Sequence, residues 1–297
     1  MTMNKQDMTA QMAAGQGFIA ALDQSGGSTP KALQGYGVSD GEWNGEEEMY
    51  ALIHRMRSRI ITSPCFSNGK VIGAILFEKT MDGQVEGKPT PQALIDRGVV
   101  PFIKIDKGLE EIADGVQLMK PMPDLDALLT RASALGVFGT KERSVIHEAN
   151  PRGIAAAVAQ QFEVGRQVLG HGMMPILEPE YTITAADRAE GEDILLTEIF
   201  RNLESLEEGK QVMLKLSIPV RANLYRELID HPKVLAVVAL SGGYSTDEAC
   251  EKLAQNKGMI ASFSRGLLQD LRAQQSDEEF DATLGDAIDR IHAASVA

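Results

Sequence analysis

The sequence predicts an α/β fold, a single (β/α)8 barrel (TIM barrel) that spans residues 1–297. The prediction rests on eight short apolar runs that alternate with longer amphipathic stretches. The runs are almost continuously apolar, as expected of parallel strands that are covered on both faces. An open, doubly wound sheet is the alternative, but no G-x-G-x-x-G turn follows a strand to support it. The expected strands are residues 17–23, 71–78, 99–106, 135–141, 173–178, 211–216, 234–241 and 259–264.

Helical signals fill the intervals between these runs. Apolar residues recur at helical spacing after the acidic segment 46–48, and arginines follow at 55–59, an order that suits the helix dipole. Asn150-Pro151 predicts an N-cap and a first helical residue for a helix over 154–169. Further helices are expected over 184–206 and 221–230, and capping boxes at 245–248 and 276–279 open two more.

Composition narrows the classes of function. The 297 residues carry a formal net charge of −13, so the chain lacks the basic face that nucleic-acid binding needs. An anionic ligand would require basic residues concentrated at its site. Cys65 and Cys250 form neither a C-x-x-C pair nor a disulfide framework. The N-terminus lacks a signal-peptide pattern, and no run approaches the ~18 apolar residues of a membrane span. We therefore expect a cytoplasmic protein that binds neither nucleic acid nor membranes.

Lys215 lies inside the apolar run 212–219, which is typical of a buried strand. Lysine is rarely buried without a partner. Burial disfavours an ammonium ion and frees an amine to attack a carbonyl. The alternative is structural: the side chain reaches solvent at the strand end or pairs with a carboxylate. Taken alone, Lys215 favours the structural interpretation.

The expected strands end in an unusual set of polar residues. Active sites of such barrels lie at the C-terminal ends of the strands, so these groups should meet at one mouth. Each could be a cap or a surface charge, but their shared position favours a functional role for Lys215. The set comprises Asp23, Glu78, Lys104, Asp106, Lys141, Glu178, Lys215, Ser241, Ser264 and Arg265.

Two glycine-containing loops are suited to binding anions. The segment 241–245 follows the seventh strand and leads into a helix, where glycines let backbone N–H groups approach a phosphate. Arg265, after the eighth strand, would add a charge-assisted contact. A second loop, 23–28, follows the first strand. Each Gly-Gly pair alone is a weak signal, but the two together indicate a ligand with two anionic ends.

Glu178-Pro179-Glu180 ends the fifth expected strand, where a carboxylate near a lysine can act as a general acid and base. A surface acidic turn is the alternative. The five histidines share no short ligand spacing, so we expect no metal site and no cofactor. Carbonyl chemistry on sugar phosphates uses either a metal or an amine, and this sequence supplies the amine.

Taken together, these motifs resemble those of a known family, the class I (Schiff-base) fructose-bisphosphate aldolases, in particular their short bacterial form. The order and strand placement of the matching segments are specific, although each segment alone is not. The resemblance extends over most of the chain, in segments 20–28, 103–108, 139–143, 175–180, 214–215, 240–243 and 262–265.

This resemblance implies a role for each matching side chain. Lys215 would form the Schiff base. Glu178 would accept and donate protons, and Glu180 would shape the electric field around Glu178. Asp23 would orient or deprotonate a substrate hydroxyl beside Lys141. Small-molecule sugar phosphates would be the substrates, with fructose 1,6-bisphosphate cleaved reversibly to dihydroxyacetone phosphate and glyceraldehyde 3-phosphate. The residues expected to bind substrate are Ser25, Ser28, Lys104, Arg143, Ser241, Gly242, Gly243, Ser264 and Arg265.

The sequence departs from the animal members of this family at three places. The chain ends in Ala297 without the C-terminal tyrosine that assists proton transfer, Gln24 replaces a glutamate, and Ala32 replaces an arginine. The first leaves the late proton donor open, and the last weakens the second phosphate site.

Two other functions stay open at this stage. One keeps the Schiff base with another phosphorylated ketose or a transaldolase-type transfer. The other is a non-catalytic barrel that binds sugar phosphates, although phosphate binding alone needs no buried amine. A homo-oligomer is compatible with the sequence, which does not determine the oligomeric state.

Overall fold

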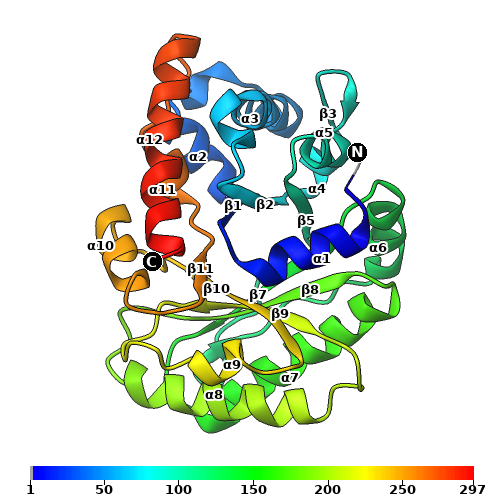
Figure 1. The fold of residues 1–297 in the computed structure, drawn as a ribbon, viewed down its shortest axis with the longest axis vertical. Helices are drawn as coiled ribbons and strands as arrows, with labels where there is room; N and C mark the ends of the chain where they lie inside the picture. Colours follow the sequence, from blue (N-terminus) through cyan, green and yellow to red (C-terminus); the bar gives the residue numbers. More distant parts are fainter. Residues whose placement is uncertain (1–2) are drawn as a thin grey trace.

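The predicted barrel is confirmed by a computed structural model that describes residues 3–297 (Figure 1). Its eight barrel strands are all parallel and follow one another in chain order around a near-closed sheet. They are β1 (Phe18–Leu22), β2 (Val71–Leu76), β5 (Val100–Lys104), β7 (Gly139–Ile146), β8 (Met174–Tyr181), β9 (Val212–Ser217), β10 (Val234–Leu240) and β11 (Met259–Ala261).

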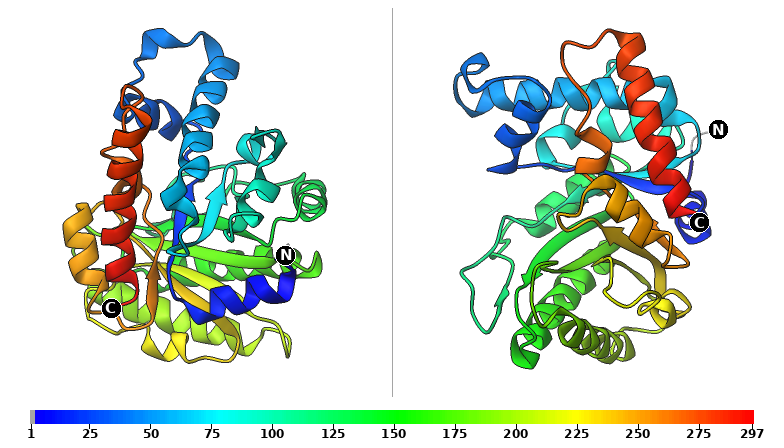
Figure 2. Two further views of the ribbon diagram at one scale, coloured as in Figure 1. Left: turned by 45° about the horizontal axis from the view of Figure 1, so that its top comes forward. Right: turned by 90° about the vertical axis from the view of Figure 1, so that its left-hand side faces the viewer.

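Helices surround this sheet, and short strands and turns lie in the segments that connect its strands (Figure 2). The strands β3 (Gln84–Val85) and β4 (Lys88–Pro89) form an antiparallel hairpin. The strand β6 (Val116–Gln117) pairs antiparallel with the end of β7. Two 3-10 turns cover Asp40–Glu42 and Pro64–Ser67. The helices are α1 (Lys5–Ala14), α2 (Ser28–Gly35), α3 (Gly45–Thr62), α4 (Glu78–Met81), α5 (Thr90–Ile95), α6 (Leu125–Ala134), α7 (Pro151–Gly170), α8 (Arg188–Glu204), α9 (Arg226–Ile229), α10 (Thr246–Leu253), α11 (Arg265–Leu268) and α12 (Asp277–Ser295). None of the helices within residues 3–297 is long and apolar enough to cross a membrane.

The expected helix caps form at the predicted residues. The Asn150 side chain accepts hydrogen bonds from the first turn of α7, and Pro151 is its first residue. Ser276 opens α12 with a reciprocal capping box to Glu279. The Ser245 side chain caps α10 by accepting a hydrogen bond from the Glu248 backbone N–H, which is one of the two bonds of the capping box expected at 245–248. These local signals need no tertiary context, because each acceptor lies within three residues of its donor.

Several element boundaries differ from the sequence prediction. The strand expected over 135–141 begins at Gly139, because α6 ends at Ala134 and Gly136 turns the chain with a φ of 82°. It also continues to Ile146, pairing with a β8 that runs past Pro179 to Tyr181. Polar residues in both extensions conceal these strands. The helix expected over 221–230 is restricted to Arg226–Ile229, and α8 starts four residues later than expected.

The apolar core lies in two layers, one inside the barrel and one between the barrel and its helices. The inner layer includes Phe102 of β5 and Ile176 of β8. Met8 and Met12 of α1 belong to the same cluster, so helix α1 packs against the apolar interior of the barrel. The charged residues lie at the other ends of the strands, where no apolar plug forms.

One serine bridges the seam between the first and last barrel strands. The Ser295 hydroxyl donates to the Gly17 carbonyl at 2.7 Å and accepts from the Ala261 N–H at 2.8 Å. Gly17 leads into β1, and Ala261 ends β11. Ser295 is 6% exposed, so water cannot readily replace these bonds.

We predict that Ser295→Ala lowers the free energy of unfolding by about 1–3 kcal/mol, because two buried backbone groups lose their partner. Urea denaturation followed by circular dichroism would measure the change. Ser133→Ala on the exposed face of α6 is the control and should stay within about 0.5 kcal/mol of the wild type. Equal stability of both variants would contradict the proposed role of the bridge.

Candidate active site

The inward-facing side chains change from apolar to charged as the strands approach the mouth of the barrel. On β5, Phe102 is followed by Lys104, and on β9, Met213 is followed by Lys215. Alternate residues of a strand share a face, so this sequence pattern aims the charges inward. The result is a pocket of about 970 Å³ at the C-terminal ends of the strands. It is lined by every residue predicted to be functional: Asp23, Ser25, Ser28, Lys104, Lys141, Arg143, Glu178, Glu180, Lys215, Ser241, Gly242, Gly243, Ser264 and Arg265.

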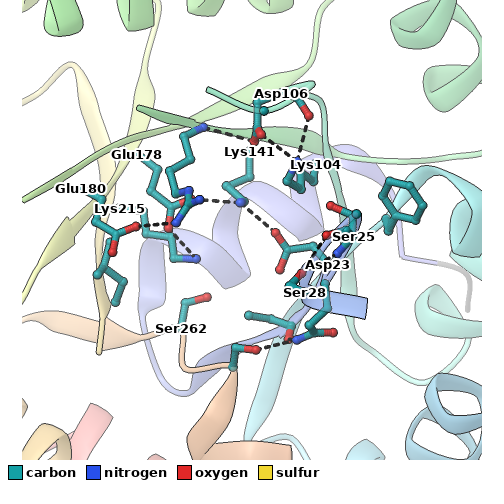
Figure 3. A pocket seen from close by; sticks show the side chains of 18 of the residues that line it. Asp23, Ser25, Ser28, Lys104, Asp106, Lys141, Glu178, Glu180, Lys215 and Ser262 are labelled. Carbon is teal, nitrogen blue, oxygen red and sulfur yellow. Dashed lines mark hydrogen bonds and ion pairs between the residues drawn. The ribbon is translucent and has the colours of Figure 1, made fainter. Parts of the chain in front are cut away.

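Four charged side chains form one continuous cluster at the floor of this pocket (Figure 3). Lys215 Nζ lies 2.9 Å from Glu178 Oε1, and Lys141 Nζ lies 3.0 Å from Glu178 Oε2. The other partner of Lys141 is Asp23, at 2.7 Å. The four side chains are no more than 11% exposed, so their charges are compensated mainly by one another.

The charge states of this cluster follow from competition between burial and neighbouring charges. Burial alone would raise the pKa of Asp23 and of Glu178, yet both pKa values are lowered because Lys141 and Lys215 lie beside the carboxylates. Burial would lower the pKa of Lys141, but the two carboxylates outweigh burial and raise it. Both acids are therefore ionised at neutral pH, and Lys141 is an ammonium ion.

Lys215 satisfies the structural interpretation and the functional one at once. It is 5% exposed and is paired with a carboxylate, as a buried lysine should be. The partner, however, is Glu178, which also borders the pocket. The pair therefore places an amine beside a carboxylate at the surface of the polar pocket.

Two further cations at the mouth have carboxylate partners. Lys104 Nζ lies 2.7 Å from Asp106 Oδ1, and Arg143 Nη1 lies 3.0 Å from Glu180 Oε2. The pKa of Arg143 is raised: burial opposes this shift, but the negative charge of Glu180 outweighs burial. Seven basic and five acidic side chains line the pocket, so positive charge is in excess there although the whole chain is acidic. This excess favours an anionic ligand.

The loop after β1 is held from behind by a buried arginine. Arg57 of α3 is fully buried and donates to the Gln24 carbonyl at 2.6 Å and to the Thr80 hydroxyl at 2.7 Å. A third bond, of 3.2 Å, reaches Gln24 Oε1, which leaves the amide nitrogen of Gln24 to donate to Ala21 and to Ser264. Gln24 thus connects the ends of β1 and β11.

The second glycine loop, after β10, has the backbone conformation expected of an anion site. Gly242 and Gly243 have φ values of 59° and 121°, which residues other than glycine rarely adopt. A Cβ on Gly242 would also lie 2.5 Å from Ile183 Cγ2. Arg265, the first residue of α11, lines the same part of the pocket, and its side chain lies near Gly243.

The cationic groups occupy opposite sides of the barrel. β5 and β7 are the third and fourth strands around the sheet and carry Lys104 and Arg143, whereas β10 and β11 are the seventh and eighth and precede Ser241 and Arg265. In an eight-stranded barrel, strands four places apart face each other across the mouth. The floor cluster lies between these two groups.

Ser25 and Ser28, which were expected to bind substrate together with Lys104, line the same pocket as Lys104. They follow β1, which is next to β11 at the barrel seam and separated from β5 by β2. The Ser28 hydroxyl donates to the Ser25 carbonyl at 2.8 Å and accepts from the Ser25 N–H at 2.9 Å. These bonds shape the loop after β1.

Several residues that line the pocket escaped the sequence prediction of site residues, among them Asp106, Ser262 and Gln24. Asp106 was noted at a strand end but not assigned a function, and it proves to be the partner of Lys104. Ser262 is 2% exposed, lines the pocket and has a hydroxyl without a hydrogen-bond partner among the described residues. Figure 3 shows it on the Lys215 side of the cavity. Gln24 was noted only as a departure from the family pattern. Ser262 and Gln24 had weak local signals, because each occurs in a segment of small or polar residues.

Glu142 lies outside the group of residues that line the pocket and is fully buried. The Thr140 hydroxyl donates a hydrogen bond to Glu142 Oε2 at 3.1 Å, and Oε1 has no partner within residues 3–297. Burial raises the pKa of Glu142 well above the ordinary value of 4.5. A carboxyl with a raised folded-state pKa is best tolerated at low pH, and stability is lost as pH rises through that pKa. Glu142 is therefore destabilising at neutral pH.

We predict that Glu142→Gln stabilises the protein at neutral pH and that the gain disappears toward pH 4. Urea unfolding at several pH values would measure it, with the difference between variant and wild type growing as pH rises above the ordinary glutamate pKa. Exposed Glu208→Gln is the control and should give a small difference that does not depend on pH. A gain for Glu142→Gln that is constant from pH 4 to 8 would contradict this assignment.

Comparisons with known proteins agree with this architecture. A sequence profile of the family described as fructose-bisphosphate aldolase class-I, a glycolytic family, matches residues 5–213. A solved fructose-bisphosphate aldolase from Plasmodium falciparum superposes with a TM-score of 0.73 at 19% identity, over 97% of this chain and 95% of that one. Cgl0159 from Corynebacterium glutamicum superposes with a TM-score of 0.53 at 13% identity, over 98% and 92% of the two chains. At these identities the structural matches establish the fold.

Proposed function

Because the chain belongs to the class I fructose-bisphosphate aldolase family, we propose that it cleaves fructose 1,6-bisphosphate reversibly through a Schiff base on Lys215. The products are dihydroxyacetone phosphate and glyceraldehyde 3-phosphate. The observation that carries the proposal is the buried Lys215–Glu178 contact of 2.9 Å on a pocket floor between two cationic groups. It supports an amine and a proton carrier at the place where a ketone would lie.

Imine formation uses the two halves of this contact. Glu178 accepts a proton from Lys215, and the neutral amine adds to the C2 ketone to give a carbinolamine. Glu178 then returns the proton to the C2 hydroxyl, water leaves, and an iminium ion remains. Because Glu178 is ionised at rest, it is ready for the first transfer.

Carbon–carbon cleavage uses Asp23 and Lys141. Asp23 takes the proton of the C4 hydroxyl as the C3–C4 bond breaks, and the iminium accepts the electron pair to form an enamine. Lys141, 2.7 Å from Asp23, holds this carboxylate in place and stabilises negative charge that develops on oxygen. Glyceraldehyde 3-phosphate leaves first.

The cationic groups at the two sides of the mouth accommodate the two phosphates of the substrate. Ser241, Gly242 and Arg265 bind one, and Lys104 with Arg143 binds the other. Lys104 and Arg143 are already paired with carboxylates, so the second phosphate shares these cations with their partners. Reaction at C2 and C4 then falls between the two phosphates, over the floor cluster.

The enamine must finally be protonated at C3, and we assign this step to Glu178. Glu178 first regains a proton from Lys141, which in turn takes up the proton that Asp23 removed from the C4 hydroxyl. None of the residues that line the pocket within the described range 3–297 is a tyrosine. Glu178 is the carboxylate in contact with Lys215 and is therefore closest to the enamine nitrogen. Reprotonation and hydrolysis of the imine release dihydroxyacetone phosphate.

We predict that borohydride treatment in the presence of dihydroxyacetone phosphate attaches a reduced adduct to Lys215. Peptide mass spectrometry would locate it, and Lys215→Met should remove both the adduct and the activity. Lys210→Met, which changes an exposed lysine on the preceding turn, is the matched control and should behave like the wild type. An adduct on another lysine, or loss of activity on treatment with a chelator, would refute the proposal. A panel of phosphorylated ketoses in the same assay tests substrate choice.

We predict that Glu178→Gln lowers kcat by at least about 100-fold with little change in KM, since the variant keeps the shape of the site but cannot carry a proton. Steady-state cleavage assays would measure both constants. Glu180→Gln, which alters the neighbouring carboxylate, should have a smaller effect on kcat. The role of Glu178 is wrong if the two variants are equally active.

A further inference from the structure

Arg188, at the start of α8, joins two parts of the mouth that are far apart in sequence. It is 4% exposed and lies outside the group of residues that line the pocket. Its Nε donates to Glu192 Oε1 at 2.7 Å, and its Nη2 donates to the Ile218 carbonyl. Its Nη1 donates to the Tyr244 hydroxyl at 2.9 Å. One guanidinium group therefore contacts both the end of the Lys215 strand and the residue after the Gly242-Gly243 loop.

These contacts fix the loop from behind. Tyr244 directly follows Gly243, and its N–H donates to the Ser241 carbonyl at 3.0 Å, closing the turn. Ile183, from the segment before α8, occupies the space beneath Gly242. The loop thus rests on the β8–α8 segment, with Arg188 as its polar anchor.

The rest of the Arg188 environment holds the guanidinium group in place. Glu192 is 1% exposed, and its second oxygen accepts from the Val220 N–H at 2.8 Å. Arg188 is thereby paired with a fixed carboxylate, and three of its nitrogens have acceptors. A planar guanidinium with this many directed bonds determines the positions of its acceptors, which a lysine could not do.

We propose that Arg188 is a positioning residue that, through the Tyr244 hydroxyl, orients the Ser241–Gly243 loop for phosphate binding. This inference rests on the proposed function, because it assumes that this loop binds a phosphate of the substrate. Backbone N–H donors bind an anion well only when they are already aimed at it. Loss of the anchor should therefore weaken phosphate binding without touching the reacting groups.

The chain supplies a matched pair of tyrosines for the test. The Tyr244 hydroxyl is bonded to Arg188, whereas the hydroxyl of Tyr225, which lies in the same environment, is buried without a hydrogen-bond partner among residues 3–297. Tyr244→Phe keeps the ring, including its contact with Lys252 Nζ at 5.0 Å from the centroid. Tyr225→Phe removes a hydroxyl that bonds to nothing.

We predict that Tyr244→Phe weakens the binding of inorganic phosphate roughly fivefold, the equivalent of one hydrogen bond. Calorimetric titration of the full chain, well below its melting temperature, would measure the dissociation constant. Tyr225→Phe should bind phosphate like the wild type. In cleavage assays, Tyr244→Phe should raise KM for the bisphosphate and leave kcat near the wild-type value.

A double-mutant cycle separates positioning from general destabilisation. Arg188→Lys keeps a charge beside Glu192 but loses the directed bonds, so it should weaken phosphate binding by itself and add nothing in the Tyr244→Phe background. Additive effects would overturn the inference, as would equal phosphate affinity of Tyr244→Phe and the wild type. Failure of the proposed function would look different: wild-type protein would still bind phosphate but would trap no ketone with borohydride.

Discussion

The buried cluster of Lys215, Glu178, Lys141 and Asp23 is the constraint on which the rest of this structure depends. Moving an ion from water into a protein interior costs several kcal/mol, and only close partners offset that cost. In this cluster each ammonium group meets at least one carboxylate within 3.0 Å. Because any member that lost its partner would be left charged and buried, the four strands that carry them must hold a fixed relative position.

The helices around the barrel contribute polar side chains that hold the mouth in this arrangement. Gln161 of α7 accepts the Glu178 N–H at 3.1 Å, where β8 diverges from its ladder with β9. Arg57 of α3 holds the loop after β1 through Gln24, and Arg188 of α8 contacts the segments after β9 and β10. Each of these segments of the mouth is therefore held by a buried side chain of an outer helix.

The electrostatics of the pocket differ from those of the whole molecule. A net charge of −13 would repel an anionic substrate at long range. At the pocket, basic side chains outnumber acidic ones, and low exposure of the floor cluster limits screening by salt. Cations on opposing strands lie on opposite sides of the mouth, separated by the width of the barrel. This separation favours a ligand with phosphates at both ends over a ligand with one.

Much of this protein was determined by local sequence. Eight apolar runs predicted the barrel, the caps at Asn150 and Ser276 depend on neighbouring residues alone, and polar residues at strand ends were brought to one pocket by the alternation of side chains. The tertiary structure decided which side chains become partners. It pairs Lys215 with Glu178, and it brings Arg57 and Arg188 from outer helices into contact with the loops at the mouth. It also decided that β7 and β8 extend through polar residues. Backbone pairing of β7 with β8, and of β6 with β7, stabilises these extensions although their sequences are not apolar. Charge pairing and strand extension depend on residues distant in sequence, so no local pattern could reveal them.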